Sequence, residues 1–452
     1  TQMPKESARW SFFASVIANL ISLYWIGLNS GASGVAVLLS LVGAILYLSI
    51  MWAVLGWIVA MIEKNIGNSL SIIPFLWVTM EWVRSFGPLG FPWANLATTQ
   101  TVFLPVIQMI EITGTEGIGF WILLVNVVTY ISIHAETNKR NLTIYSIISF
   151  SLPWIYGSIR MPEFEFDEKK PYRELAVLQP NINPNVKWEA SFRPRLYEIM
   201  DSLHTEAMSM NPDLILWPEA ALPAYMRVSP KRRDYEWLVM ESGIPIVMGT
   251  VDFHRDTTGR RVYNGSIYIG LEGNKIYHKI FLVPFAEYIP MSDKFTLLKK
   301  LNFGQANFTA GSEFTVFKMD SILFSNLICY ESSHPEVARG FVQNGARFLT
   351  IEANDAWLRN SSGVRQHFEL ARLRAVELRT GIVRSANTGI SGIIYPSGKV
   401  EKRIPFGEQA VFKGKVPLRS SMTFFALYGS VFAQICLIIT LVQIVWLIKR
   451  LN

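Results

Sequence analysis

Long uncharged stretches dominate both ends of the chain. The five longest contain no Asp, Glu, Lys or Arg; they are 11–28, 35–62, 117–133, 142–159 and 422–448. A shorter uncharged run, 66–80, contains Pro74. Because a helix needs about 20 mostly apolar residues to cross a bilayer, this pattern predicts six membrane spans, five early in the chain and one at its end. The stretch 97–110 is too short and too polar to cross, which favours an interfacial or re-entrant segment.

The middle of the chain, from Met161 to Arg419, has frequent charges and apolar runs of strand length. The runs typical of buried strands are LAVLQP, LILWPE, PIVMGT, NLICYE and FLTIEAN. Strands that alternate with helices predict an α/β layer fold. In the helix predicted over QHFELARLRAVELR, we expect the charged residues to form a solvated face; they are Glu369, Arg372, Arg374 and Glu377.

We therefore expect three parts along the chain. A bundle of five transmembrane helices occupies 1–160, an α/β domain occupies 161–419, and a last transmembrane helix occupies 420–452. The composition agrees, because only 17% of the residues are charged and 50% are hydrophobic, whereas soluble domains have about 25% charged residues. The formal charge of +7 comes without a basic stripe interleaved with aromatic residues, so we expect no nucleic-acid partner.

Basic residues beside the predicted spans indicate the orientation. If the spans alternate, these residues all fall on the side that the positive-inside rule assigns to the cytoplasm; they are Lys5, Arg9, Lys64, Lys139, Arg140, Lys449 and Arg450. The large domain then lies outside, in the periplasm if there is an outer membrane. A secretory signal is the alternative for the first span, but its length and the lack of a clear cleavage site argue against it. The chain starts at Thr1 and not at Met, so we expect residues ahead of it.

Two cysteines occur in the chain, and they lie in very different surroundings. Cys436 lies within a predicted span, whereas Cys329 ends an apolar strand just before a turn at Pro335. A disulfide would have to join a lipid-buried helix to a polar domain, so we expect both thiols to be free. By itself, Cys329 is equally compatible with a small buried hydrophobic residue and with a nucleophile at a strand end.

Three charged residues stand in apolar segments that would make them costly unless they are paired. Glu219 follows the strand LILW, and Lys279 and Glu287 lie in NKIYHKIFLVPFAEYIP. Each could form a structural ion pair. Together with Cys329 they could also perform acyl transfer, with Glu219 as the base for the thiol and Lys279 as the cation that stabilises an oxyanion.

A Cys–His pair is the alternative chemistry, with His334 or His278 as the base. If 276–282 is a strand, His278 and Lys279 point to opposite faces, so only one can reach a shared site. His334 follows the turn after Cys329 and stays a candidate. The other histidines show no metal-ligand spacing, and we expect no metal site; they are His134, His204, His254 and His367.

Three motifs resemble the catalytic motifs of the nitrilase, or carbon–nitrogen hydrolase, superfamily. They are LWPEAALP, YHKIFLVPFAEYIP and ICYES, in the usual order Glu, Lys, Cys. The segments LQPNINPNVKWE and GFPWANLA, and the long segment from EANDAW to PSGKV, are similar to the membrane-bound branch, the apolipoprotein N-acyltransferases. The resemblance covers nearly the whole chain. Members normally carry two further spans ahead of the position that matches Thr1.

This resemblance implies a nitrilase-like αββα sandwich inserted before the last helix of a transmembrane bundle. It implies a bacterial inner-membrane enzyme whose catalytic domain faces the periplasm. Cys329 would take an acyl chain from a phospholipid donor and pass it to the α-amine of a diacylated apolipoprotein. The resemblance implies no cofactor, and we expect a monomer among membrane lipids.

Residue roles carry over from the motifs. Glu219, Lys279 and Cys329 would form the catalytic triad. The supporting residues would be Glu287, Glu331, Tyr330 and Asn354, and the substrate-binding residues would be Trp188, Trp357, Phe91 and Trp93. Phe91 and Trp93 could equally be interfacial anchors, and Asn354 could belong to a turn. The segment KFTLLKKLNFGQANF could be a lid that opens to lipid or a plain surface helix.

Two other functions stay open. In a membrane-tethered amidase of the same superfamily, water and not an amine would resolve the thioester. A degenerate domain that only binds lipoproteins is the third possibility, although the presence of all three triad residue types argues against it.

Overall fold

The computed structural model describes residues 3–257, 259–291 and 307–451. The chain forms two compact units. A helical unit comprises Thr1–Gly27, Val37–Glu163 and Thr423–Asn452, and an α/β unit comprises Leu28–Ala36 and Phe164–Met422. The short segment Leu28–Ala36, which joins two apolar helices, therefore belongs to the α/β unit, where the Ser30 amide donates a hydrogen bond to the carbonyl of Trp357 over 3.2 Å.

Among the described residues, five helical segments are long and apolar enough to cross a membrane, which makes the chain a multi-pass membrane protein. They are Pro4–Leu28 (α1 Pro4–Leu23 with η1 Tyr24–Leu28), Gly34–Asn65 (α2), Glu116–His134 (α6), Lys139–Phe164 (α7 Lys139–Arg160 with η4 Met161–Phe164) and Val431–Leu451 (α13). The expected span 66–80 coincides with a shorter apolar helix, Ser69–Val83 (η2 Ser69–Ile72 and α3 Ile73–Val83). The stretch 97–110 lies in short helices; they are η3 Leu96–Gln100, α4 Leu104–Ile107 and α5 Ile110–Thr113.

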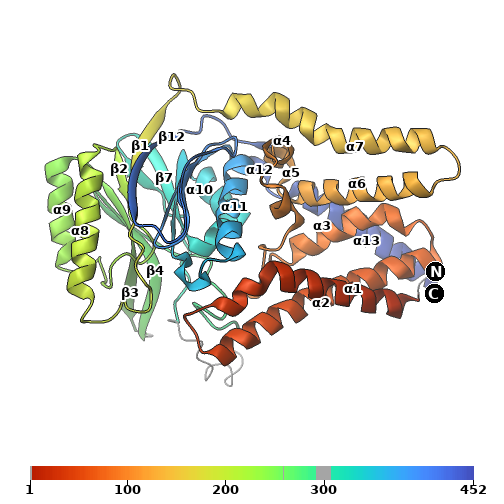
Figure 1. Ribbon diagram of the computed structural model, residues 1–452, viewed down its shortest axis with the longest axis horizontal. Helices are drawn as coiled ribbons and strands as arrows, with labels where there is room; N and C mark the ends of the chain where they lie inside the picture. Colours follow the sequence, from red (N-terminus) through yellow and green to blue (C-terminus); the bar gives the residue numbers. More distant parts are fainter. Residues whose placement is uncertain (1–2, 258, 292–306, 452) are drawn as a thin grey trace. The chain divides into compact units, whose positions relative to one another are not determined.

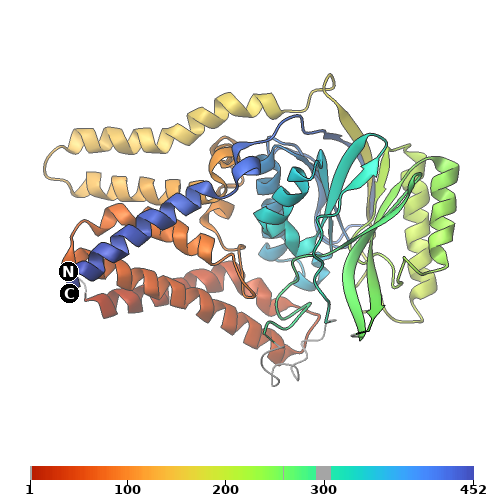
Figure 2. The same cartoon turned by 180° about the vertical axis from the view of Figure 1, so that it is seen from behind.

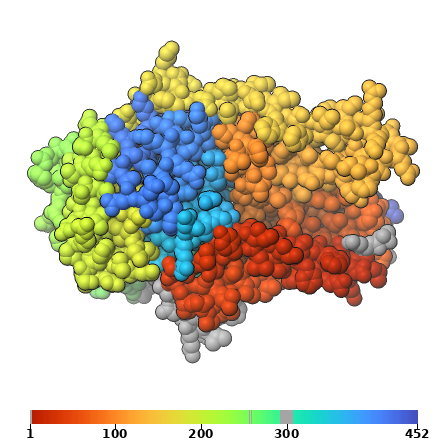
Figure 3. Space-filling model, in the orientation of Figure 1, coloured from red at the N-terminus to blue at the C-terminus, as the bar shows by residue number. Residues whose placement is uncertain are grey.

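The helical unit exposes large apolar side chains along its long helices. Leu39 on α2, Ile147 on α7 and Val442 on α13 are each about 60% exposed, and Figure 3 shows the side chains of α1 and α2 at the surface. Contiguous exposed apolar surface of this kind is unfavourable in water and favourable in lipid. The exposed side chains therefore support the membrane assignment independently of helix length.

Small and polar side chains join the helices inside this unit. Cys436 on α13 is buried against Val78 on α3 and Ala433, and the hydroxyl groups of Thr79 and Thr440 lie 3.0 Å apart. Both cysteines are free. The predictions that the two thiols are unpaired and that Cys436 packs against neighbouring helices are confirmed.

The α/β unit contains two six-stranded sheets with the same pairing pattern. The first has the order β12-β1-β2-β3-β4-β5 and the second, read from its other edge, has the order β6-β7-β8-β9-β10-β11. In each, the second, third and fourth strands are parallel and all other neighbours are antiparallel. The strands are β1 Tyr172–Gln179, β2 Leu214–Leu216, β3 Ile246–Asp256, β4 Gly259–Gly270, β5 Gly273–His278, β6 Phe317–Met319, β7 Ile322–Ile328, β8 Phe348–Ala353, β9 Gly381–Ala386, β10 Ser391–Ile394, β11 Val400–Ile404 and β12 Ala410–Pro417.

Helices cover the outer faces of both sheets. Helices α8 (Arg193–Ser209) and α9 (Lys231–Ser242) pack on the first sheet, and α10 (Pro335–Gln343) and α11 (Ser362–Leu378) pack on the second (Figures 1 and 2). The predicted αββα sandwich is confirmed. From β1 in the first sheet and from β7 in the second, the chain follows the same order of strand, helix, strand, helix and three further strands. Strands β1 and β7 are therefore equivalent, as are β2 and β8.

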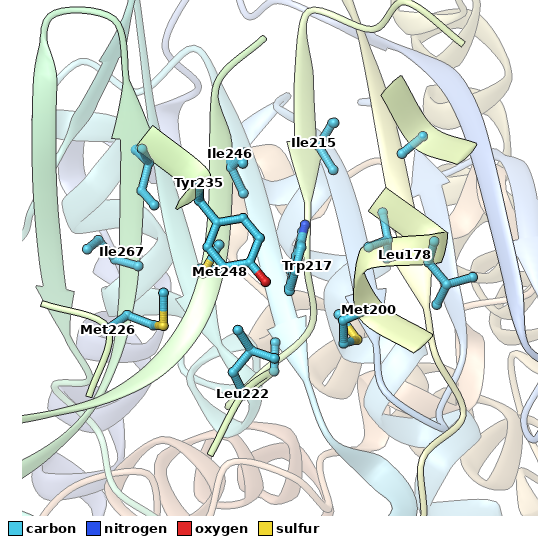
Figure 4. Close-up of a cluster of buried hydrophobic side chains, with 14 of the residues drawn as sticks. Leu178, Met200, Ile215, Trp217, Leu222, Met226, Tyr235, Ile246, Met248 and Ile267 are labelled. Carbon is cyan, nitrogen blue, oxygen red and sulfur yellow. The ribbon is translucent and has the colours of Figure 1, made fainter. Parts of the chain in front are cut away.

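A continuous apolar layer joins α8 and α9 to the first sheet. Figure 4 shows Trp217 between Tyr235 of α9 and Met200 of α8, with Ile215 and Met248 from the strands. Trp217 is fully buried, and burial of one such large side chain contributes about 1.5–3 kcal/mol. Because Trp217 lies two residues before Glu219, this core holds the end of β2 in place.

The charged residues of α11 do not form the solvated face that we expected. Arg374 and Glu377 are buried and form an ion pair of 2.7 Å, and Arg374 also donates to the carbonyl of Ser333 over 3.2 Å. Glu369 and Arg372 pair at 2.8 Å and are mostly buried as well. Helical spacing cannot distinguish a solvated charge from one that is buried with its partner, so that prediction was wrong.

Gly249 on β3 allows the chain to pass very close to the segment that carries Glu219. A Cβ atom at this position would lie 2.3 Å from the Ala220 nitrogen and 2.6 Å from the Glu219 Cα atom. Because both are backbone atoms, Gly249→Ala is expected to lower the free energy of unfolding by about 1–3 kcal/mol. The melting temperature in detergent measures this effect. Gly43→Ala, where the added methyl group meets no atom within 4 Å, is the control, and an equal effect of the two substitutions would contradict the prediction.

Candidate active site

Three strand ends in the α/β unit bring together residues that are far apart in the sequence. Glu219 follows β2 and Lys279 follows β5 of the first sheet, and Cys329 follows β7 of the second. The side chains of Glu219 and Lys279 are buried, and Cys329 is partly exposed. The sandwich thus supplies the carboxylate and the ammonium group from one sheet and the thiol from the other.

Lys279 is the centre of a buried charge cluster. Its Nζ atom lies 2.8 Å from Glu287 Oε2, 2.9 Å from Glu287 Oε1 and 3.9 Å from Glu219 Oε1. Asn264 on β4 donates both amide hydrogens, one to Glu219 Oε1 and one to Glu287 Oε1, each over 2.8 Å. The sequence motifs did not identify Asn264, because it lies in the middle of a strand with no apolar break or unusual neighbour to mark it.

The cluster keeps its ammonium group charged. Burial by itself lowers the pKa of Lys279, but the attraction of Glu287 and then of Glu219 outweighs burial and raises that pKa above its usual range. Burial raises the pKa of Glu219; Lys279 opposes this shift, and the like charge of Glu287 adds to it. Glu219 is therefore a stronger proton acceptor than an exposed carboxylate, next to a permanent positive charge.

Cys329 lies at a sharp turn from strand to helix. Its φ angle of 52° is in the left-handed region, which is unfavourable for a side chain with a Cβ atom. Burial raises the pKa of the Cys329 thiol well above its usual range, the negative charge of Glu219 raises it further, and Lys279 lowers it. The resting thiol is therefore neutral, and the carboxylate of Glu219 acts on it electrostatically.

Glu331 holds the turn that presents Cys329. One carboxylate oxygen accepts the Ile328 amide over 2.8 Å, and the other accepts the Tyr277 hydroxyl over 2.6 Å and the Ile280 amide over 2.7 Å. Ile328 precedes Cys329 and Ile280 follows Lys279. One buried carboxylate thus couples the position of Cys329 to that of Lys279.

A second buried network supports Cys329 from its other side. His367 Nε2 lies 2.9 Å from the Cys329 carbonyl oxygen, and His367 Nδ1 lies 2.6 Å from Asp355 Oδ1. Arg384 donates to the other oxygen of Asp355 over 2.7 Å. Burial raises the pKa of Asp355, but His367 and Arg384 outweigh it and lower that pKa to about 2. No sequence pattern links Asp355, His367 and Arg384, because they come from three separate elements of the fold.

The two histidines considered as alternative bases have other surroundings. His278 lies 2.9 Å from Asp252 and stacks on Tyr263. The strand considered over 276–282 does not form, because β5 ends at His278, so strand alternation does not relate His278 to Lys279. Burial, with Arg374 and then Lys279, lowers the pKa of His334 to about 3. Its ring packs on Phe281 and Tyr330. These contacts favour Glu219 as the partner of the thiol.

Tertiary structure also gathers two groups of possible metal ligands that sequence spacing did not indicate. One consists of Asp252, His254 and His278, and the other contains Cys329 with Asp355 and His367. In the first group, Arg227 already contacts one oxygen of Asp252 over 2.8 Å and His278 contacts the other. In the second, both His367 nitrogens are used in the support of Cys329. In both groups, possible metal ligands already form hydrogen bonds or ion pairs with other residues of the described structure.

The other predicted residues are distributed over both units. Asn354 follows β8 and accepts a hydrogen bond from Asn387 over 3.1 Å. Tyr330, next to Cys329 in the chain, is buried, and Trp188 is 48% exposed. Trp357 lies in η7 (Asp355–Leu358), close to Asp355 in the chain. Phe91 and Trp93 belong to the helical unit.

Trp93 itself is buried and packs on Trp25 with ring centroids 5.1 Å apart. Arg84 fixes the loop by donating to the Ala94 carbonyl over 3.0 Å and to Asn95 over 2.7 Å. Glu81 accepts the Leu96 amide over 2.9 Å. A role of Phe91 and Trp93 in substrate binding stays a prediction. The expected lid, KFTLLKKLNFGQANF, lies almost entirely outside the described residues.

Comparison with known proteins gives matches over nearly the whole chain. The profile of the carbon-nitrogen hydrolase family matches residues 174–421, and that of the apolipoprotein N-acyltransferase N-terminal domain matches residues 1–128. A Geobacter metallireducens protein named apolipoprotein N-acyltransferase is 32% identical over 452 residues, which cover 96% of this chain and 85% of that protein. A protein of the same name from Chlorobaculum tepidum is 28% identical over 467 residues, with 95% and 85% coverage. Among solved structures, Saccharomyces cerevisiae Nit3, of the nitrilase superfamily, shares 17% identity at a TM-score of 0.41 and covers 56% of this chain and 93% of its own.

Opposite effects of Glu219 and Lys279 on the thiol can be measured by alkylation. In a Cys436→Ser background, Lys279→Met is expected to move the pH midpoint of Cys329 alkylation by iodoacetamide upward, because it removes the charge that lowers the thiol pKa. Glu219→Gln is expected to move the midpoint downward, because it removes a charge that raises that pKa. Intact mass measured against pH gives both midpoints. Shifts in the same direction would contradict the arrangement of charges described above.

Asp355 is expected to stabilise the fold in its charged form. Its pKa in the folded chain, about 2, lies below the ordinary value of 3.8, so its contribution is present above pH 3.8 and is lost as the pH falls toward about 2. Asp355→Asn should therefore lower the melting temperature at neutral pH, and the difference from the parent should shrink over that acid range. A difference that does not depend on pH would show that the charge of Asp355 is unimportant.

Proposed function

The chain belongs to the apolipoprotein N-acyltransferase family, and we propose that it transfers an acyl chain from a membrane phospholipid to the α-amine of a diacylated apolipoprotein. Cys329 carries the acyl group between the two substrates as a thioester. Glu219, Lys279 and Cys329 form the catalytic triad. One observation carries this proposal: the Glu219 carboxylate, whose charge acts on the Cys329 thiol, lies 3.9 Å from the Lys279 ammonium group.

In the first half-reaction, Glu219 takes the thiol proton and the sulfur attacks the ester carbonyl carbon of the phospholipid. Negative charge develops on the carbonyl oxygen, and Lys279, which its carboxylate neighbours keep protonated, stabilises that charge. When the intermediate collapses, the ester C–O bond breaks. The leaving lysophospholipid oxygen takes the proton from Glu219, and a thioester stays on Cys329.

In the second half-reaction, the neutral α-amine of the acceptor attacks the thioester carbon. Glu219 takes a proton from the attacking nitrogen, the C–S bond breaks, and the proton passes to the Cys329 sulfur. The N-acylated lipoprotein leaves and the neutral thiol is restored. Glu287 does not transfer a proton in this scheme; with Asn264 it holds Lys279 and Glu219 in place.

Other residues position the reacting groups. Glu331 fixes the backbone next to Cys329 and next to Lys279. Tyr330 follows Cys329 in the chain, and Asn354 follows β8. Trp188 and Trp357 would contact the lipid substrates, since indole rings suit the boundary between apolar and polar surroundings.

We further propose that the chain lies in the bacterial inner membrane with its α/β unit in the periplasm. In Figures 1 and 2 the start of α1, the α6–α7 turn and the end of α13 lie at one end of the helical unit, together with the end of α2. These segments carry the basic residues Lys5, Lys64, Lys139 and Lys449. A positive charge excess at one end favours that end in the cytoplasm.

The function can be tested with purified protein, phospholipid and a diacylated lipopeptide. The intact chain is expected to gain the mass of one acyl group on Cys329, and the lipopeptide is then expected to gain the same mass. Cys329→Ala should abolish both gains, because no other group in the site can form the thioester. Cys436→Ser is the matched control and should leave both unchanged, since Cys436 packs among helices.

The amidase alternative gives a different result in the same experiment. If water resolved the thioester, free fatty acid would appear and the lipopeptide would never gain mass. That outcome would refute acyl transfer while keeping Cys329 as the nucleophile. Unchanged turnover by Cys329→Ala would refute Cys329 itself.

A further inference from the structure

Lys187 is a buried lysine that the proposed chemistry does not use. It lies in the segment between β1 and α8, and only 2% of it is exposed, whereas its neighbour Trp188 is 48% exposed. A lysine normally extends its ammonium group into water. Lys187 is instead buried, although the next residue in the chain, Trp188, is about half exposed.

Hydrogen bonds tie the segment that carries Lys187 to the strand ends around Cys329. Asn387, which follows β9, accepts the Ile182 amide over 3.0 Å and donates to the Ile182 carbonyl over 2.7 Å. The same side chain donates to Asn354 over 3.1 Å, and the Asn387 amide donates to the Ala353 carbonyl over 2.9 Å. The segment is therefore fixed at the edge of the sandwich where the candidate active site lies.

Lys187 has no counter-ion of its own within the described part of the chain. No ion pair or side-chain hydrogen bond joins it to a described residue, and Glu219 is the charged group that acts on it. Burial lowers the pKa of Lys187 to about 8, with Glu219 opposing that shift. Glu219 already accepts a hydrogen bond from Asn264 and lies 3.9 Å from Lys279 Nζ. A buried ammonium group without a partner is unfavourable, and the arrival of an anion would remove that cost.

We propose that Lys187 binds the phosphate group of the lipid acyl donor. This inference rests on the proposed function. Of the groups that enter the site, the phosphodiester is the one with a permanent negative charge; the acceptor brings an amine, and the transient oxyanion faces Lys279. An ammonium group and a phosphate oxygen form a strong charge-assisted hydrogen bond. Trp188, next in the chain, offers an apolar surface with a polar edge for the glycerol portion of the same lipid.

Phosphate recognition predicts that the effect of Lys187 depends on the donor. The experiment follows formation of the acyl-enzyme on Cys329 by intact mass, without acceptor, in detergent micelles. It uses two donors with the same acyl chains, phosphatidylglycerol and diacylglycerol. Lys187→Met should slow acylation by phosphatidylglycerol about tenfold or more, as expected for the loss of a charged hydrogen bond. Acylation by diacylglycerol should change little, and Lys187→Arg should restore part of the rate with phosphatidylglycerol.

Control variants and alternative outcomes make the test decisive. Lys318→Met removes a lysine that is paired with Glu272 at the surface and should affect neither donor. If Lys187→Met and Lys187→Arg slowed acyl-enzyme formation equally with both donors, Lys187 would act in folding or in catalysis and not in phosphate binding. That result would overturn the proposal. Unchanged acylation with slower transfer to a lipopeptide would make Lys187 a base for the acceptor amine, which also overturns it.

Failure of the proposed function would be recognised separately. In that case the parent chain itself would form no acyl-enzyme from either donor, and the assignment of Lys187 would fall with it. Acylation of the parent by both donors, without any donor-dependent effect of Lys187, would refute the phosphate site alone.

Discussion

One amide group holds the candidate active site together. Asn264 has two amide hydrogens and gives one to each of the carboxylates Glu219 and Glu287, which would otherwise repel each other in a space with little water. Lys279 lies between them and balances their charge. Buried charges are tolerated when each has partners of fixed geometry. The strand positions of the first sheet supply that geometry, so the chemistry depends on the fold.

The two sheets contribute different parts of the candidate site. Glu219, the proposed base, follows the third strand of the first sheet, β2, and Cys329, the proposed nucleophile, follows the second strand of the other sheet, β7. Buried networks then fix the Cys329 turn from two sides, Glu331 through backbone amides and His367 through the Cys329 carbonyl. The strained φ angle of Cys329 is maintained by these contacts. Preorganisation of this kind reduces the rearrangement needed when charge develops in the reaction.

The charge balance around Glu219 also connects the site to its substrates. Among the described residues, Lys279 has two carboxylate partners, whereas Glu219 is the one charged group that acts on Lys187. The charge of Lys279 is therefore already balanced, and Lys187 could bind an anion supplied by a substrate. The phosphate group of a lipid donor would neutralise the positive charge of Lys187. Binding of the donor and activation of the thiol would then act on the same carboxylate.

The α/β class, the long apolar helices and the set of motif residues could all be predicted from the linear sequence. Each depends on local information: apolar runs of span or strand length, and charged residues set inside apolar segments such as those of Glu219 and Lys279. Which of these groups lie in contact with one another followed from the three-dimensional fold. Asn264, Asp355, His367 and Arg384 became visible through contacts between separate elements, and Arg374 and Glu377 proved buried although their spacing suits a solvated face. The physical reason is that a side chain's burial and partners are set by the elements that pack against it, and a linear pattern does not contain that information.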